Sequence, residues 1–230
     1  MLNRALVCTE EVAYTKIKQR ILDGSLAPGA RLVHRALAKE LEMSPNPVVL
    51  ALRMLERDGL IVNTPGLGAC VRQWSRREIE DLYHMRVHQE ALASRLCAER
   101  AGHDEMNRIA AANELFKETI AKKDVEENIR ADVGIHMAIV AGAHSPDLER
   151  VVESLAIMQC SMKAFGLSLG VPRDLSRQVR DVHDPLVKAI IARDPKLAER
   201  LAREHVRMSL KKNLPWIKEV VEAFGTGTNG

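Results

Sequence analysis

Residues 42–59 read EMSPNPVVLALRMLERDG, and this stretch decides the fold of the first part of the chain. Ser44 is a suitable helix N-cap, and Pro45 suits the first helical position. An apolar stripe at spacings of four and three predicts one buried helix face: Val48, Leu52 and Leu55. Gly59 ends the pattern. The first two turns of this predicted helix contain no Arg or Lys.

The elements around this helix predict a winged helix-turn-helix. Residues 11–22 have a helical pattern, the segment DGSLAPGARL is rich in turn residues, and HRALAKELEM is typical of a short helix. After Gly59 the sequence changes to two short strand-like stretches, LIVNT and ACVRQW, joined by the turn PGLG. This order favours a DNA-binding domain with the hairpin as its wing over a small α+β domain that binds no nucleic acid.

The composition favours helices and places the positive charge in the first third of the chain. Aromatic residues are only 3% of the 230, so the core must be built from aliphatic side chains. Residues 1–76 carry 11 Lys and Arg against 7 Asp and Glu, whereas residues 77–230 carry 23 against 24. A basic first third is expected of a domain that meets a polyanion.

Cysteine spacing and hydropathy predict a cytoplasmic protein. The cysteines form no CxxC pair and suit reduced thiols: Cys8, Cys70, Cys97 and Cys160. No apolar run reaches the roughly 18 residues of a membrane span, so we expect none. The opening residues, MLNRALVCTEEVAYTK, meet charge too early for a secretory signal.

The rest of the chain has only helical patterns. Ser75 and Glu78 have the spacing of a capping box at the start of the next helix. Helices then continue to about residue 222, with breaks at 101–104, 122–125, 144–147, 166–174 and 194–195. We therefore predict a mainly α protein with a winged domain at 1–74, an antiparallel all-α bundle at 75–222 and a flexible tail at 223–230.

Three histidines and one aspartate are predicted to point into this bundle. Asp132 and His136 are four residues apart in IRADVGIHMAIV, and His136 falls on the apolar face. His183 and His205 each line up with the aliphatic residues of their own helices. Imidazole and carboxylate groups together suit a divalent transition metal such as Zn²⁺, Ni²⁺, Mn²⁺ or Fe²⁺. The alternatives are a purely structural polar interior and a metal-dependent hydrolase that activates water.

Arg86 and Glu90 form a second polar pair on an inward helix face. Either they are an internal ion pair, or Arg86 binds an anionic ligand with its guanidinium group. His84 and His88 fall on the opposite face of the same helix, so we expect them at the surface. The histidines in or beside predicted turns are weaker metal ligands: His34, His103 and His144.

These motifs together resemble the GntR family of transcription regulators, in its FadR-type branch with an FCD ligand-binding domain. RILDGSLAPGA and LAKELEMSPNPVVLALRMLERDGLI resemble the family's winged domain. DLYHMRVHQEALASRLCAERA resembles the first FCD helix, with Arg86 and Glu90 at its typical Arg and Glu. Asp132 and His136 match its D-x3-H, while His183 and His205 match its last two histidines.

The resemblance implies a homodimeric regulator, most often a repressor, rather than an enzyme. It would bind a short palindromic DNA operator and release it when a small organic acid enters the helical domain, often beside a metal. The implied metal ligands are Asp132, His136, His183 and His205. Residues expected to meet DNA are the cations, the helix start and the wing glycine: Arg31, Arg35, Ser44, Asn46, Arg53 and Gly68.

The sequence departs from the family pattern at the start of the helix predicted within residues 42–59. The family usually has S-R-x-P-V-R, and here Pro45 and Val49 stand in place of both arginines. Because arginine is the usual partner of guanine, two outcomes are open. Either the protein reads a different operator through Ser44, Asn46 and DNA shape, or it is a ligand-binding dimer with weak DNA binding. Pro185, two residues after His183, also suggests that a helix starts there and shifts that imidazole.

Overall fold

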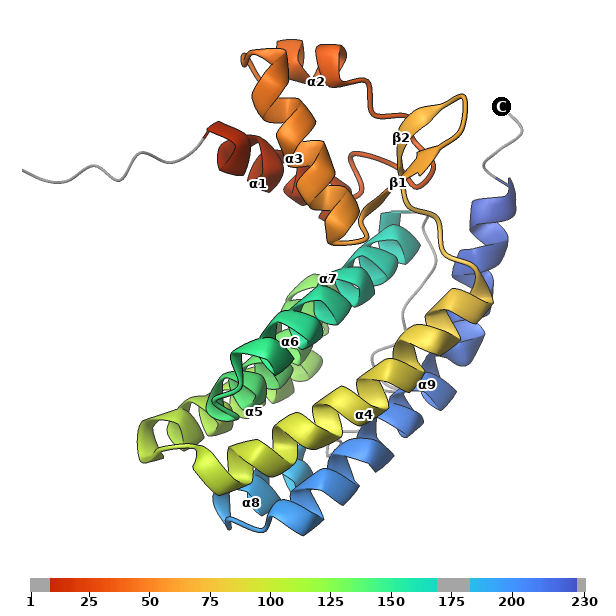
Figure 1. Cartoon of the computed structure of the whole chain (residues 1–230). Helices are drawn as coiled ribbons and strands as arrows, with labels where there is room; N and C mark the ends of the chain where they lie inside the picture. The colour runs from red at the N-terminus through yellow and green to blue at the C-terminus, as the bar shows by residue number, and fades with distance from the viewer. Residues whose placement is uncertain (1–8, 169–182, 227–230) are drawn as a thin grey trace, which may run out of the picture. The chain divides into compact units, whose positions relative to one another are not determined.

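The computed structural model describes residues 9–168 and 183–226, in which helices dominate and one small hairpin is present (Figure 1). The chain divides into two compact units, and the first junction falls between Trp74 and Ser75. The second half of helix α7, from Ile157 onward, is grouped with the first unit. The predicted extent of the helical domain, residues 75–222, therefore remains a prediction. No helix in the described part is both long and apolar enough to cross a membrane.

The part of the first unit that ends at Trp74 contains, in its described residues, three helices followed by a two-stranded antiparallel sheet (Figure 1). The elements are α1 (Thr9–Leu22), α2 (His34–Glu40), α3 (Pro45–Arg57), β1 (Ile61–Thr64) and β2 (Gly68–Val71). Helix α3 packs mainly against α1, whose buried side chains are Ala13, Ile17 and Ile21. This confirms the predicted winged helix-turn-helix order.

Helix α3 forms where the stretch 42–59 predicts it. Ser44 has extended backbone angles at the N-cap and Pro45 takes the first position, although the Ser44 side chain makes no capping hydrogen bond. The predicted stripe is buried, with Ala51 added to it: Val48, Ala51, Leu52 and Leu55. Gly59 follows with a φ of +74°, a left-handed conformation that glycine adopts without strain, so the chain turns away.

The wing is a short hairpin closed by Thr64, Pro65, Gly66 and Leu67. The Leu67 N–H donates to the Thr64 carbonyl at 3.0 Å, and Gly66 has a φ of +80°. Pro followed by a left-handed Gly is the pattern of a type II turn. Strand β2 ends at Val71, short of the predicted Trp74, because β1 begins at Ile61, the partner of Val71.

A third segment lines the outer edge of the wing, which the sequence did not predict. Arg31 forms an isolated bridge with Cys70, and the Leu32 N–H donates to the Ala69 carbonyl at 2.7 Å. The end of the turn-rich segment before α2 is therefore hydrogen-bonded to the free edge of β2.

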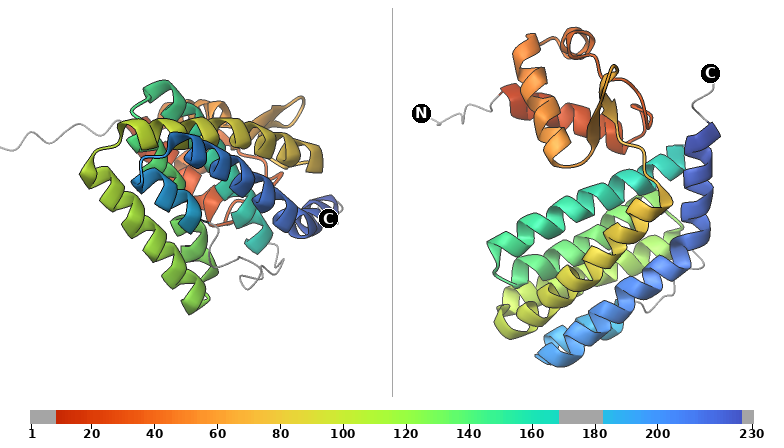
Figure 2. Two further views of the ribbon diagram at one scale, coloured as in Figure 1. Left: turned by 90° about the horizontal axis from the view of Figure 1, so that it is seen from below. Right: turned by 45° about the vertical axis from the view of Figure 1, so that its right-hand side comes forward.

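The second unit is helical, as predicted (Figure 2). The helices after Trp74 are α4 (Arg76–Arg100), α5 (His103–Lys122), α6 (Val125–Gly142), α7 (Pro146–Ser168), α8 (Asp184–Ile191) and α9 (Pro195–Thr226). The second unit holds them all except α7 from Ile157 onward and α9 from Ala223 onward. The predicted breaks near 101–104, 122–125, 144–147 and 194–195 are confirmed. The break at 166–174 falls largely outside the described residues, and α9 continues to Thr226 rather than ending near 222.

Side chains at the helix starts explain two of these boundaries. The Ser75 hydroxyl accepts from the Glu78 N–H while the Glu78 carboxylate accepts from the Ser75 N–H, which completes the predicted capping box. The Asp124 carboxylate accepts from the Glu127 N–H at 2.9 Å and caps α6 in the same way.

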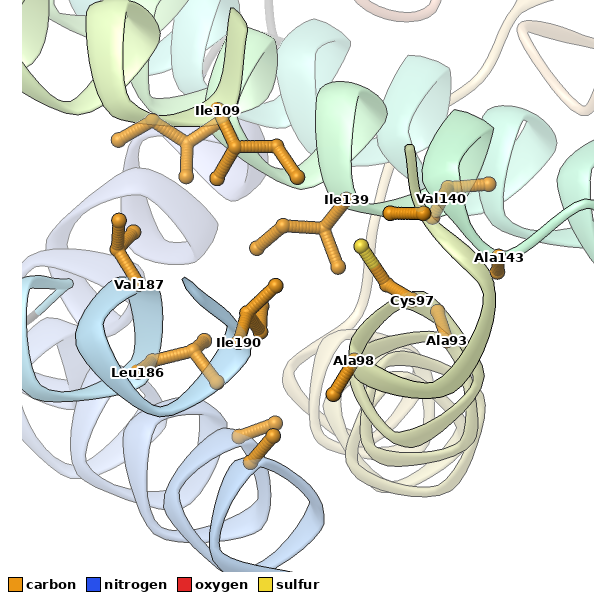
Figure 3. Close-up of a cluster of buried hydrophobic side chains, with 14 of the residues drawn as sticks. Ala93, Cys97, Ala98, Ile109, Ile139, Val140, Ala143, Leu186, Val187 and Ile190 are labelled. Carbon is orange, nitrogen blue, oxygen red and sulfur yellow. The ribbon is translucent and has the colours of Figure 1, made fainter. Parts of the chain in front are cut away.

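The core of this unit is aliphatic, as the low aromatic content requires. Figure 3 shows Cys97, Ile109, Ile139 and Ile190 directed toward one another from α4, α5, α6 and α8. Helices α4 and α6 approach closely at Gly142, where an added Cβ would lie 2.8 Å from the Cys97 Sγ. This packing holds the helices that carry the polar residues described next.

Candidate metal centre and DNA-binding surface

Three histidines from three helices meet inside the helical unit. His136 lies on α6, His183 is the N-cap of α8, and His205 lies on α9. All three are buried, and one ring nitrogen from each lies within 4.8 Å of the others. Their ring centroids are 4.4–5.3 Å apart. The structure thus brings together three of the four predicted metal ligands.

His183 takes its place through contacts that the sequence did not reveal. Helix α8 begins at Asp184, as Pro185 suggested, yet the imidazole still joins the other two. Its ring packs edge-on against Phe116 at 4.6 Å between centroids. The Asp184 carboxylate accepts hydrogen bonds from Lys117 at 2.6 Å and from Asn113 at 2.5 Å, which fastens the start of α8 to α5.

Asp132, the fourth predicted ligand, lies at the edge of this cluster. Its Oδ1 is 3.5 Å from His183 Nε2, and its side chain is 16% exposed. It does not belong to the group of atoms that lie within 4.8 Å of one another. Its role as a ligand therefore stays a prediction, whereas the three histidines are placed together by the fold.

Glu90 contacts His136 directly, a contact that the sequence did not predict. The His136 Nδ1 lies 2.8 Å from Glu90 Oε2, and both side chains are buried. A carboxylate only accepts, so Nδ1 must carry the proton and donate it, which leaves the lone pair on Nε2. Such a carboxylate behind a histidine fixes the ring orientation that a metal ligand needs.

Arg86 completes a buried chain of charges with Glu90. Its Nε donates to Glu90 Oε1 at 2.6 Å, and its guanidinium lies 5.0 Å from the centre of the Tyr83 ring. The internal pair considered from the sequence is therefore present. The Arg86 Nη1 is buried and has no hydrogen-bond partner among the described residues, so one donor remains for a ligand.

The charges in this cluster set the protonation of its members. Burial alone would raise the pKa of Glu90, but the charge of Arg86 and the hydrogen bond from His136 hold that pKa far below its usual range. Burial, with the neighbouring imidazoles, lowers the pKa of His205 well below its ordinary value. Burial alone would lower the pKa of Arg86, but Glu90, Tyr83 and Asp132 together raise it above its ordinary value. Glu90 is thus anionic and His205 neutral at pH 7.

The ring nitrogens that face the cluster fit a metal ion. His136 Nε2 and His205 Nδ1 are buried and lack hydrogen-bond partners in the described part of the chain. Unpaired buried polar atoms are costly, and neutral imidazole nitrogens are common ligands of divalent transition metals. One ring nitrogen from each of the three histidines lies within 4.8 Å of the others, so the three imidazoles could share one ion.

The remaining histidines lie at the surface, which was predicted for His84 and His88. His84 and His88 are exposed on α4, and the His88 ring contacts Arg203 of α9. His34 and His103 are exposed at helix starts, and His144 pairs with Glu105 at 3.0 Å. None of them belongs to a group of three ligand atoms among the described residues.

The predicted DNA-binding residues are all exposed on the first unit. Ser44 and Asn46 lie at the start of α3, and Arg35 lies on α2. Arg31, Arg53 and Gly68 surround one groove of about 340 Å³ between α3 and the wing. Its other lining residues are Leu32, Val33, His34, Val49, Leu52, Glu56, Ile61, Asn63, Leu67 and Ala69. Sequence reasoning did not find this groove, because its walls are distant in the chain.

Comparison with known proteins agrees with both halves of this architecture. Residues 9–71 match the model of "Bacterial regulatory proteins, gntR family", and residues 81–208 match the model of the FCD domain. The chain belongs to the GntR family, with an FCD domain. Its members are transcription regulators, so this protein is a regulator rather than the metal-dependent hydrolase that its sequence left open.

Individual relatives are distant but similar over most of the chain. A Paenarthrobacter nicotinovorans protein named "Probable D-xylose utilization operon transcriptional repressor" is 29% identical over 83% of this chain and 82% of its own. The HTH-type transcriptional regulator YdhC of Bacillus subtilis is 27% identical over 61% of this chain, which covers 63% of that protein. The structure of Escherichia coli McbR/YncC has a TM-score of 0.75 at 22% identity and covers 90% of this chain and 97% of its own.

Proposed function

We propose that this regulator is a homodimeric repressor that binds a DNA operator and responds to a small carboxylate beside a metal ion. The ion, Zn²⁺, Ni²⁺ or Mn²⁺, is held by His136, His183 and His205, with Asp132 as a further ligand. Arg86 binds the carboxylate, and Glu90 orients His136. The exposed start of α3, the groove cations and the wing bind DNA.

The observation that carries the metal proposal is the buried group of three imidazoles. One ring nitrogen from each lies within 4.8 Å of the others, and a carboxylate contacts one of the rings. A bound divalent ion supplies positive charge and open coordination positions that accept a carboxylate oxygen. A purely structural interior would leave two buried ring nitrogens without any partner in the described residues.

Arg86 supports a carboxylate ligand. Its Nη1 is buried without a hydrogen-bond partner among the described residues, while its Nε donates to Glu90, and a guanidinium fork is well suited to carboxylates. Because Glu90 anchors the same guanidinium, Arg86 is held in place before any ligand arrives. A relative from Bacillus licheniformis is named "Gluconate operon transcriptional repressor", and gluconate is a carboxylate of the proposed class.

The direction of regulation rests on the relatives. Two further names are "HTH-type transcriptional repressor GlaR" and "Glc operon transcriptional activator", both from Escherichia coli. A promoter fusion decides between these directions: deletion of the gene should raise expression of the adjacent operon. A fall in expression would identify an activator instead.

Metal binding is tested on protein purified without chelator. We expect about one divalent ion per chain by elemental analysis and a rise in melting temperature when Zn²⁺, Ni²⁺ or Mn²⁺ is added to the metal-free protein. His136→Ala should abolish this rise, whereas the exposed His84→Ala should leave it unchanged. No metal in the wild type and no thermal shift would favour the structural interior.

DNA binding and assembly are tested together. The full-length protein should sediment as a dimer and should bind its own upstream region far more tightly than random DNA of the same length at two salt concentrations. Equal affinity for both DNAs would contradict operator binding and support the ligand-binding dimer with weak DNA binding. Gluconate, added to metal-loaded protein, is the first carboxylate to test for release of DNA.

A further inference from the structure

The start of α3 presents an unusual surface for a helix that reads DNA. In a helix-turn-helix the first residues of the second helix contact base edges in the major groove. Here Pro45 and Asn46 are exposed in the first turn, and Val49 lies half-buried one turn later. No residue of 45–52 is charged. The base-facing end therefore offers apolar surface, the Asn46 amide and the Ser44 hydroxyl, but no charged group.

The groove that Val49 helps to line has both apolar and cationic side chains in its walls. Val33 and Leu67 line it with 44% and 52% of their surfaces exposed, from the segment before α2 and from the wing tip. Arg31 and Arg53 also line the groove, and neither forms an ion pair with the described residues. Its acidic member, Glu56, accepts a hydrogen bond from Asn63 at 2.8 Å.

These charges fit a nucleic-acid backbone. Unpaired arginines on the rim suit phosphate groups, which give affinity without sequence information. Base discrimination must then come from the first turns of α3, where no guanidinium is available for a guanine edge. The major groove presents one apolar group, the C5 methyl of thymine, and asparagine pairs with adenine through its N6 and N7 atoms.

The geometry points to thymine and adenine as the bases that this protein reads. Pro45 and Val49 contact thymine methyl groups, and Asn46 pairs with an adjacent adenine, while Arg31 and Arg53 hold the phosphates. The occupant of this surface is therefore duplex DNA with A·T pairs where the start of α3 meets each half-site. This inference rests on the proposed operator binding and gives it a base preference.

The first experiment selects bound sequences from a random duplex library with the full-length protein. We expect a motif with two-fold symmetry. Each half-site should carry A·T pairs at the positions that the start of α3 contacts. Val49→Arg should change one of these pairs to G·C, because arginine prefers guanine. Arg53→Ala should weaken binding to every sequence and leave the motif unchanged.

The second experiment removes only the methyl groups. Replacing thymine by deoxyuridine in the selected site keeps every hydrogen bond and deletes the C5 methyl. Loss of one buried methyl should lower affinity about fourfold. In Val49→Ala, whose shorter side chain no longer reaches the methyl, the same replacement at the facing thymine should have no effect.

The outcomes separate this inference from the proposed function. If no motif is enriched, operator binding fails, and the base preference fails with it. If a motif is enriched but carries G·C pairs at these positions, or if deoxyuridine binds as well as thymine, operator binding stands and the apolar readout is refuted.

Discussion

Glu90→Gln tests the link between the buried ion pair and metal binding. The substitution keeps the size of the side chain and an acceptor for His136 Nδ1, but it removes the negative charge that lies 2.8 Å from that ring. If Glu90 orients and polarises His136, the variant should bind a divalent ion more weakly. Arg86, which donates to the same carboxylate, loses its partner at the same time.

The expected magnitude follows from burial. The side chains of His136 and Glu90 are only 8% and 7% exposed, so solvent does not screen their contact. Loss of a carboxylate behind a metal-bound histidine typically lowers metal affinity about 10- to 100-fold, or about 1.4–2.7 kcal/mol. Because glutamine still accepts a hydrogen bond, we expect about tenfold. The unpaired buried Arg86 should also lower the free energy of unfolding by about 3–5 kcal/mol.

The assay must separate these two effects. Zinc affinity is measured by competition with a chelator, on samples whose helical content is verified by circular dichroism. The double variant Arg86→Met with Glu90→Gln removes both charges and should regain stability but not metal affinity. Glu105→Gln is the matched control, since it alters a carboxylate–histidine pair with His144 at the surface. Zinc affinity within twofold of wild type in folded Glu90→Gln would refute the orienting role.

Three other predictions concern the helical unit. Gly142→Ala should lower the free energy of unfolding in urea by about 1–3 kcal/mol, because its Cβ would lie 2.8 Å from the Cys97 Sγ. Gly134→Ala in the same helix meets nothing within 4 Å and should raise it by about 0.5–1 kcal/mol; the opposite order would contradict this packing. Burial raises the pKa of Cys97 to about 12, so at pH 8 only roughly one thiol in 10⁴ is ionised, and iodoacetamide should not label it in the native protein. Ser75→Ala removes a capping box and should cost about 1 kcal/mol of stability in thermal unfolding; no change would show that the box contributes nothing.

The sequence predicted the elements well because local rules determine them. The stripe at Val48, Leu52 and Leu55 and the Pro65–Gly66 turn depend on nearby residues only. The inward direction of His136 followed from helical spacing in the same way. Strand β2 was predicted too long because its end depends on where its partner, Ile61, begins.

Contacts between helices could not be predicted in this way. The spacing of apolar residues placed Glu90 and His136 on inward helix faces. It could not predict how far α4 is shifted along α6, or how it is rotated against it. The approach of Glu90 to His136 rather than to Arg86 alone was therefore missed. The same limit applies to Phe116, which packs on His183 from a helix far away in the sequence.

The cluster around His136 has a consequence for the amount of regulator in the cell. Its histidines come from α6, the start of α8 and α9, so a bound ion would join three separate segments of the chain, while Glu90 of α4 contacts one of these histidines. Binding to the folded state alone stabilises it, by about 2.7 kcal/mol when free metal exceeds the dissociation constant 100-fold. The unfolded fraction open to proteases then falls about 100-fold. Metal supply would thus set the lifetime of the regulator as well as its response to a ligand.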